Sequence, residues 1–280
     1  MPRSFIRKRI YICAAIILSL FWGERLLCRF LFLQTKSQST WDIPYNPQEL
    51  EHIKAILKQP LRFLGVGSQC FAFVSKDDQY VIKICKAPRY KNPQKKEADF
   101  LSYLLAFQQI PTQSQMIFLH LNPTETLQIS LKILDPLGLP HFLKADHLSF
   151  YIQKKLTPFR DYLEPILPTL SILQARNIVD ELLELCAASC KKPIQVRDIQ
   201  LKNIGRQEGK FFWMDPGRIR KKNALPSLEE QKKEFSRLSS RLKPFLTALH
   251  PIFASVLEEA IPKKLNDLNV LAESPDFPKS

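Results

Sequence analysis

"VRDIQLKNIG", residues 196–205, is the stretch that decides the fold. It opens with an Arg–Asp pair, and Asn203 follows Asp198 by five residues. A carboxylate and an amide at this separation suit a loop that orients a substrate hydroxyl and binds Mg²⁺. The alternative is an ordinary polar turn in which Asn203 caps a loop. The neighbouring motifs have to distinguish these two interpretations.

Downstream, "FFWMDPGRI" begins at residue 211 and places Asp215 seventeen residues after Asp198. A hydrophobic strand that ends in Asp-Pro-Gly delivers a carboxylate at a turn, where it can serve as a hard oxygen ligand for Mg²⁺. The alternative is that Asp-Pro-Gly simply forms a turn, since all three residue types favour turns.

Upstream, "GVGS" (residues 65–68) lies between two predicted strands. A glycine turn between antiparallel strands lets backbone N–H groups approach phosphates, so we expect Gly65, Gly67 and Ser68 to contact nucleotide. A plain hairpin is the alternative. Because a strand and not a helix follows the glycines, the motif disfavours a dinucleotide-binding fold.

Two further charged residues follow the glycine turn. Lys83 interrupts the apolar strand "YVIKIC" (residues 80–85), where its ammonium can pair with phosphate oxygens. Glu97 opens the next helix, and a carboxylate there can hold the lysine in position. An edge-strand lysine facing water and an acid favoured by a helical first turn are the alternatives.

The composition limits the possible classes of protein. At 280 residues, with 45% hydrophobic and 24% charged residues, the chain is long and apolar enough for a globular protein. Its net charge of +14 suits nucleic acid, anionic lipid or phosphorylated substrates, or reflects a solvated basic surface. We do not expect nucleic acid as the partner, because the sequence has no zinc-finger spacing, no heptad zipper and no RNP-like pattern.

None of the six cysteines forms a CxxC pair, and the histidines are too scattered to complete a metal site. Cys186 and Cys190 are four residues apart on a predicted helix, so they share one face. Core packing is favoured there over a pair of metal ligands.

The N-terminal segment, residues 1–33, combines basic residues with an apolar run at residues 10–22. Three interpretations are open: a signal peptide, an uncleaved membrane anchor, or an amphipathic or buried helix. We expect membrane association through residues 10–33, as a single-pass or peripheral protein of an inner or cytoplasmic membrane. A polar, proline-containing linker over residues 34–48 then leads into the globular part.

The globular part changes character along its length. Strand patterns dominate residues 49–153, with a β-meander over 61–86, further strands at 127–134 and 148–156, and helices at 48–58 and 92–110. Residues 154–280 are mainly helical, with a strong amphipathic pattern at 174–192. A strand-rich part followed by a helix-rich part predicts an α+β fold with two lobes.

A glycine hairpin, a strand lysine, a helix glutamate, R-D-x-x-x-x-N and a strand ending in D-x-G follow one another in this order. The set resembles the protein-kinase signature, over about residues 50–240. The resemblance implies a two-lobed kinase-like fold with a β-rich N-lobe and a truncated helical C-lobe. It also implies that ATP and Mg²⁺ are the cofactors.

The resemblance assigns a role to each residue. Lys83 would pair with the α/β-phosphates of ATP and with Glu97, and Asp198 would be the catalytic aspartate. Asn203 and Asp215 would bind Mg²⁺, and Asn203 would thereby contact the nucleotide. "FYIQKKL" would contribute the hinge around Gln153, where adenine rests.

The chain departs from the family at Cys70 for the third glycine, Val196 for histidine and Pro216 for phenylalanine. It also lacks an A-P-E sequence, so the peptide-substrate platform is expected to be reduced. These features resemble atypical bacterial-type kinase-like phosphotransferases that act on a hydroxyl of a small molecule, a sugar or lipid-linked glycan, or a protein. The alternatives are a pseudokinase serving as a membrane-associated binding or regulatory module, and a basic membrane-surface or nucleic-acid-binding protein with chance motif matches.

Overall fold

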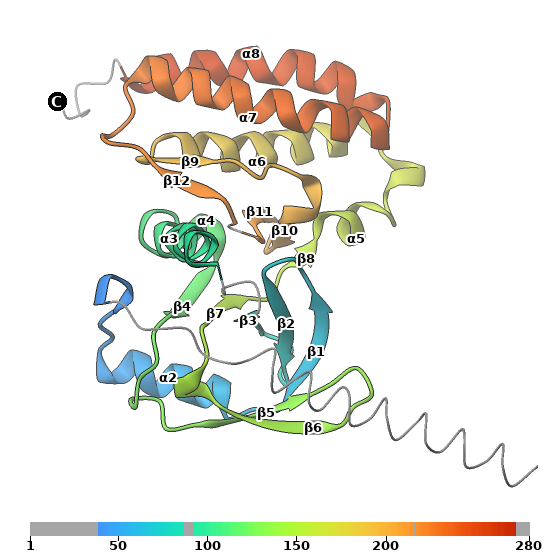
Figure 1. Cartoon of the computed structure of the whole chain (residues 1–280). Helices are drawn as coiled ribbons and strands as arrows, with labels where there is room; N and C mark the ends of the chain where they lie inside the picture. The colour runs from blue at the N-terminus through green and yellow to red at the C-terminus, as the bar shows by residue number, and fades with distance from the viewer. Residues whose placement is uncertain (1–38, 87–91, 216, 273–280) are drawn as a thin grey trace, which may run out of the picture. The chain divides into compact units, whose positions relative to one another are not determined.

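The computed structural model describes residues 39–86, 92–215 and 217–272 (Figure 1). The predicted N-terminal segment (residues 1–33), the first part of the linker and Pro216 lie outside the described residues. Within them, the chain is an α+β protein, as predicted.

The described helices are α2 (Pro47–Leu57), α3 (Pro93–Gln109), α4 (Pro111–Ser114), α5 (Phe159–Leu163), α6 (Ile172–Cys190), α7 (Leu228–Leu249) and α8 (Ile252–Ala272). Short 3₁₀ turns are η1 (Ser39–Trp41), η3 (Ala145–His147), η4 (Leu167–Thr169) and η5 (Leu201–Asn203). The strands are β1 (Leu61–Val66), β2 (Cys70–Ser75), β3 (Tyr80–Cys85), β4 (Met116–His120), β5 (Ser130–Leu134), β6 (Pro140–Lys144), β7 (Phe150–Lys154), β8 (Thr157–Pro158), β9 (Ile194–Val196), β10 (Ile204–Gln207), β11 (Lys210–Trp213) and β12 (Ile219–Lys221).

The largest sheet is mixed and has the strand order β4-β7-β3-β2-β1-β5-β6. Its central neighbours β3, β2 and β1 confirm the predicted meander. β1 pairs in parallel with β5, with Leu61 opposite Ile133, whereas β5 and β6 form an antiparallel hairpin. β5 and β7 confirm the two other predicted strands in shorter form, while β4 and β6 were not predicted.

The chain divides into two compact units that interleave along the sequence. The first unit comprises Met1–Phe73, Lys83–Lys96 and His120–Phe150, and the second comprises Val74–Ile82, Glu97–Leu119 and Tyr151–Ser280. The boundary between them therefore runs within β2 and β3. The last change of unit, at Phe150, lies near the predicted division between residues 153 and 154, which stays a prediction.

In the first unit, α2 begins with a capping box that satisfies the open N–H groups of its first turn. Asn46 accepts a hydrogen bond from the Glu49 N–H at 2.8 Å, and the Glu49 carboxylate accepts one from the Asn46 N–H at 3.0 Å. At the start of α3, the Lys96 ammonium lies 4.7 Å from the ring centroid of the buried Trp41, a cation–π contact.

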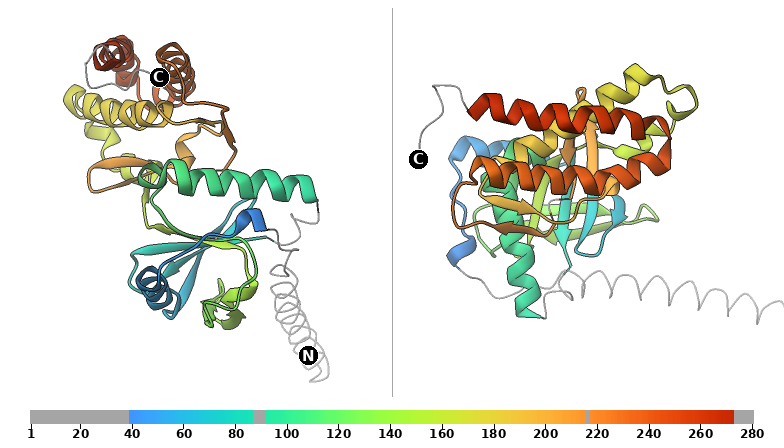
Figure 2. Two further views of the ribbon diagram at one scale, coloured as in Figure 1. Left: turned by 90° about the vertical axis from the view of Figure 1, so that its left-hand side faces the viewer. Right: turned by 90° about the horizontal axis from the view of Figure 1, so that it is seen from above.

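In the second unit, α6, α7 and α8 pack side by side (Figure 2). α6 starts at a capping box between Ser171 and Gln174, two residues before the predicted start at 174. Cys186 and Cys190 lie on its buried face, which confirms the packing interpretation. Burial raises the pKa of the Cys190 thiol to about 12, and it raises the pKa of Cys186 as well.

Among the described residues, none of the helices is both long enough and apolar enough to cross a bilayer. The predicted membrane association through residues 10–33 falls outside them and stays a prediction.

Candidate active site

Two short antiparallel ladders in the second unit frame the "VRDIQLKNIG" stretch. β9 pairs with β12, with Val196 opposite Ile219, and β10 pairs with β11, with Ile204 opposite Trp213. Asp198 lies in the loop after β9, and Asp215 lies in the connection between β11 and β12. These two segments lie close together. β12 is also fixed to α3, because the Ile219 N–H donates to Ser102 Oγ at 2.6 Å.

Asn203 joins the two loops. Its side-chain Nδ2 donates to the backbone oxygen of Asp198 at 3.0 Å. Its own backbone oxygen accepts the N–H of Met214 at 2.7 Å and that of Asp215 at 3.4 Å. The structure therefore brings Asp198, Asn203 and Asp215 together, although seventeen residues separate the two aspartates.

Among the described residues, each of these three side chains keeps one oxygen without a protein donor. Gln200 Nε2 donates to Asp198 Oδ1 at 2.8 Å, and the Gly217 N–H donates to Asp215 Oδ1 at 3.2 Å. Across the part of the chain that the structure describes, the second carboxylate oxygens and Asn203 Oδ1 accept no hydrogen bond. Asn203 is only 5% exposed, and a buried amide oxygen normally has a protein, water or cation partner.

The oxygen set of this cluster suits a hard cation. Carboxylate and amide oxygens are the ligands that Mg²⁺ takes in proteins, usually one or two from the chain with water and phosphate completing the shell. Within the described ranges, no group of three or more His, Cys, Asp and Glu side chains could hold a metal ion. The predicted ligands, one amide and one carboxylate, do not form such a group and fit a shell completed by the nucleotide.

Gly205 closes the stretch for a packing reason. A Cβ at this position would lie 2.6 Å from Leu156 Cβ and 3.2 Å from the backbone oxygen of Thr157 on β8. Those distances are too short for a side chain, so only glycine lets β10 approach β8. This constraint fixes the strand that directly follows Asn203.

The glycine turn of the first unit is different. The Gly67 N–H donates to the Cys70 oxygen at 2.9 Å and closes the turn between β1 and β2. A Cβ at Gly65 would meet nothing within 4 Å, and one at Gly67 would lie 3.8 Å from the Cys70 oxygen. Neither glycine has a left-handed φ. Glycine is therefore not required by the turn itself, and Gly67 and Ser68 are exposed to an approaching ligand.

Lys86 lies at this turn and was not predicted. Its ammonium donates to the Gly67 backbone oxygen and lies 5.0 Å from the Phe71 ring centroid, and its N–H donates to the Gln69 oxygen at 2.9 Å. No pattern in the sequence distinguishes Lys86 from the other lysines, and its role at the turn follows from these contacts alone.

Lys83 is half-buried in β3, in the first unit. Glu97 is exposed in α3, in the second unit, and the buried carboxylate of that helix is Asp99, two residues further on. The predicted pairing of Lys83 with Glu97 stays a prediction, because the two residues belong to different units.

Gln153 is 1% exposed in β7, and its Nε2 donates to the backbone oxygens of Ser114 and Trp213, the latter at 3.0 Å. The N–H groups of the next two residues also donate within the second unit, Lys154 to Gln115 at 3.0 Å and Lys155 to Gln79 at 2.8 Å. The predicted adenine-binding segment is therefore already well hydrogen-bonded by the protein.

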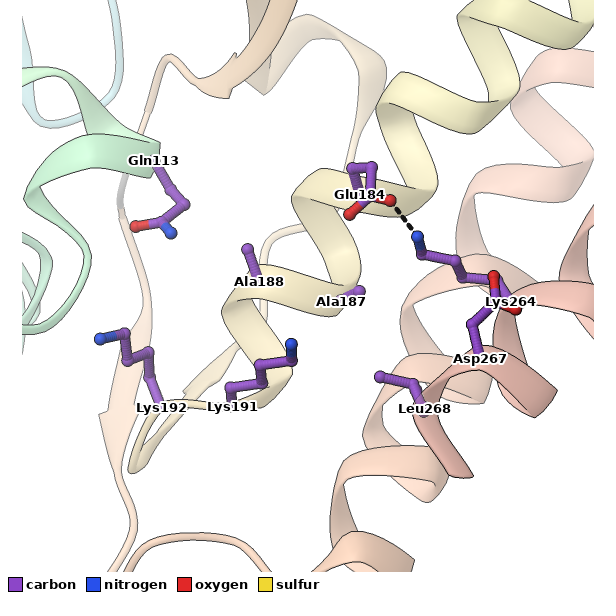
Figure 3. A pocket seen from close by; sticks show the side chains of 9 residues that line it. All are labelled: Gln113, Glu184, Ala187, Ala188, Lys191, Lys192, Lys264, Asp267 and Leu268. Atoms are coloured by element: carbon purple, nitrogen blue, oxygen red, sulfur yellow. Dashed lines mark hydrogen bonds and ion pairs between the residues drawn. The ribbon is translucent and has the colours of Figure 1, made fainter. Parts of the chain in front are cut away.

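A pocket of about 380 Å³ lies among α4, α6 and α8 of the second unit (Figure 3). Lys191, Lys192 and an ion pair between Glu184 and Lys264 line it, opposite Gln113. None of the predicted site residues lines it, and its mixed charges select no ligand.

Comparison of the chain with protein-family models and with curated proteins finds no match, so the function is argued from the residues described above.

Proposed function

We propose that the chain is an atypical, ATP- and Mg²⁺-dependent kinase-like phosphotransferase that acts on a hydroxyl of a small molecule, a sugar or lipid-linked glycan, or a protein. The observation that carries this proposal is the cluster of Asp198, Asn203 and Asp215, in which the buried Asn203 Oδ1 lacks a donor among the described residues. The two-lobed kinase-like fold, with an N-lobe over residues 49–153 and a truncated C-lobe over 154–280, belongs to the same proposal.

In this proposal, Asp198 orients the acceptor hydroxyl and takes up its proton as the γ-phosphoryl group is transferred. Asn203 Oδ1 and the second carboxylate oxygen of Asp215 hold the Mg²⁺ ion, which when bound neutralises charge on the phosphates. The amide Nδ2 of Asn203 already donates to the backbone oxygen of Asp198, so Oδ1 is the atom of this amide that would bind the metal.

The phosphate contacts come from the glycine turn and β3. The open space above Gly65 and Gly67 suits a close approach of phosphate to this turn, where the Ser68 N–H would donate, while the Gly67 N–H already donates to the Cys70 oxygen. Lys83 would pair with the α/β-phosphates and be positioned by Glu97. Gln153 would mark the segment beside adenine.

A pseudokinase is the second candidate, as a membrane-associated binding or regulatory module. One observation favours it: the N–H groups of Lys154 and Lys155, in the segment assigned to adenine, already donate to protein carbonyls. A nucleotide base that relies on those donors would have to displace existing bonds, which weakens its binding.

The test combines nucleotide binding with turnover. Wild-type protein should be stabilised against heating by Mg²⁺-ATP, because a ligand that binds only the folded state raises its stability. It should hydrolyse or transfer the γ-phosphate, and EDTA should abolish both effects. Asp215→Ala and Lys83→Ala should each lower turnover at least about 100-fold, while the matched control Asp267→Ala, an exposed residue outside the cluster, should not.

Three outcomes separate the candidates. Turnover that depends on Asp215 and Lys83 supports the phosphotransferase. Mg²⁺-ATP binding without turnover supports the pseudokinase. Wild-type protein that shows neither binding nor turnover contradicts the phosphotransferase and favours the pseudokinase.

A further inference from the structure

The loop that carries Asp198 is held at its base by α7. β9 ends at Val196, the position at which the kinase signature has histidine, and its side chain is buried and apolar. Its backbone oxygen instead accepts a hydrogen bond from Arg237 Nη2. The next backbone oxygen, that of Arg197, accepts one from Arg241 Nη1 at 3.1 Å. α7 therefore binds the two carbonyl groups that directly precede Asp198.

Arg237 is itself fixed in place. Its Nε donates to Glu234 Oε2 at 2.8 Å and its Nη2 to Glu234 Oε1 at 2.6 Å, a bidentate pair one turn apart on α7. Glu234 is 5% exposed, and Gln195 Nε2 lies 3.5 Å from the same carboxylate. Hydrogen bonding to Glu234 raises the pKa of Arg237, so the guanidinium stays charged. A planar, charge-assisted pair of this kind restricts both position and orientation.

The other side of the same backbone is held by the segment after Asp215. The Arg197 N–H donates to the Arg218 oxygen at 3.2 Å, and Val196 pairs with Ile219 in the β9–β12 ladder. The peptide units at 196 and 197 are thus bonded from both sides. Little freedom remains for the residue that follows them.

We propose that Arg237, oriented by Glu234, is a positioning residue that sets the placement of Asp198 through the backbone of Val196. The arginine supports this position by a hydrogen bond to the main chain, where the apolar Val196 side chain can form none. This inference rests on the proposed function for its consequence in catalysis, but its structural part stands separately.

A plain helix-stabilising ion pair is the competing explanation. Such a pair would stabilise α7 without restricting the loop. The two explanations differ in what happens to residues 197–203 when the guanidinium is removed.

Amide hydrogen exchange of the full chain tests the structural part. Arg237→Gln should speed exchange in residues 197–203 by about tenfold or more, because local opening of the loop becomes easier, while α6 amides keep their protection. Arg176→Gln is the matched control, since Arg176 forms an exposed ion pair with Glu259 at 2.6 Å in the same unit and does not contact the loop. Unchanged loop exchange in Arg237→Gln overturns the inference.

Kinetics test the catalytic consequence. Arg237→Gln should lower kcat about tenfold with little change in KM for ATP, since the positioning affects the transition state more than nucleotide binding. Arg237→Lys keeps the charge but loses the planar guanidinium, so it should recover only part of kcat. This variant replaces Arg237→Gln in the experiment if Arg237→Gln fails to fold. Faster loop exchange with unchanged kcat overturns the positioning role. Wild-type protein without turnover contradicts the proposed function instead, and the exchange experiment still decides the structural part.

Discussion

The loop that carries Asp198 and the glycine turn of the first unit both contain glycines, but they use them for opposite reasons. Gly205 is required from inside, because a Cβ would lie 2.6 Å from Leu156 Cβ. Gly65 would meet nothing within 4 Å, so no neighbour inside the protein requires glycine there. The first loop is constrained by its own packing, whereas the second is left open on its outer side.

This difference indicates how the two regions would be prepared for a ligand. Asp198, Asn203 and Asp215 are joined by hydrogen bonds before any ligand arrives. The glycine turn presents the exposed residues Gly67 and Ser68 on its outer side. If the proposed function holds, mutations in the joined cluster and in the exposed turn should have different effects.

The largest expected effect on the free energy of unfolding comes from removing a buried side chain next to the cluster of Asp198, Asn203 and Asp215. Trp213 is 1% exposed, its Nε1 donates to Ser189 Oγ at 2.9 Å, and it lies two residues before Asp215. Trp213→Ala should lower the free energy of unfolding by about 3–5 kcal/mol through the cavity it creates. Urea unfolding measures this. As a control at the glycine turn, the 60%-exposed Val66 should tolerate alanine with a change within about 0.5 kcal/mol.

A smaller effect distinguishes the two kinds of glycine directly. Gly205→Ala should cost about 1–3 kcal/mol, because β10 must move away from Leu156 and Thr157. Gly67→Ala should change stability by no more than about 1 kcal/mol and stabilise if it changes anything, since its φ suits alanine. Gly67→Ala should instead weaken stabilisation by Mg²⁺-ATP in a thermal-shift titration. Equal losses of stability in the two variants would contradict the comparison.

The last prediction concerns the thiols of Cys70, Cys85, Cys186 and Cys190, for which we expect the smallest change in the free energy of unfolding. Cys70 and Cys85 face each other across β2 and β3 with their Sγ atoms 3.7 Å apart, so diamide should join them in a disulfide while it is reduced to the hydrazine. The raised pKa values of Cys186 and Cys190 keep both as thiols at pH 8, and alkylating reagents should leave them unmodified in the folded protein. Peptide mass mapping of a Cys13→Ser/Cys28→Ser protein reads both results, with Cys85→Ser as the control that removes the cross-link. Modification of Cys186 before unfolding would show that α6 opens more easily than its burial indicates.

The sequence predicted the elements whose signals are local. The meander, α3, α6 and the helical C-terminal part follow from apolar periodicity. The R-D-x-x-x-x-N spacing and the strand ending in D-x-G together located Asp198, Asn203 and Asp215, which the structure brings together. β4 was missed because its partner in the sheet, β7, is distant in sequence, and β6 was missed because Pro140 opens it.

The supports of the candidate site were also missed. Arg237 and Glu234 lie in a part of the chain for which the sequence predicted only helical structure, and nothing in their spacing indicates that Arg237 binds the backbone at Val196. Lys86 was also missed, because the resemblance assigns a role to Lys83, three residues earlier, and none to Lys86. A motif identifies groups that perform chemistry, whereas the groups that hold them are specified by tertiary packing.

The interleaving of the two units has a consequence for how the protein is made. A nascent chain that has reached Phe150 contains all of the first unit but only the strips Val74–Ile82 and Glu97–Leu119 of the second. These two segments cannot complete their packing until Tyr151 and the residues after it have been synthesised. No single stretch cut from the gene encodes the second unit alone, so early folding intermediates hold unpaired strand edges that chaperones are suited to shield.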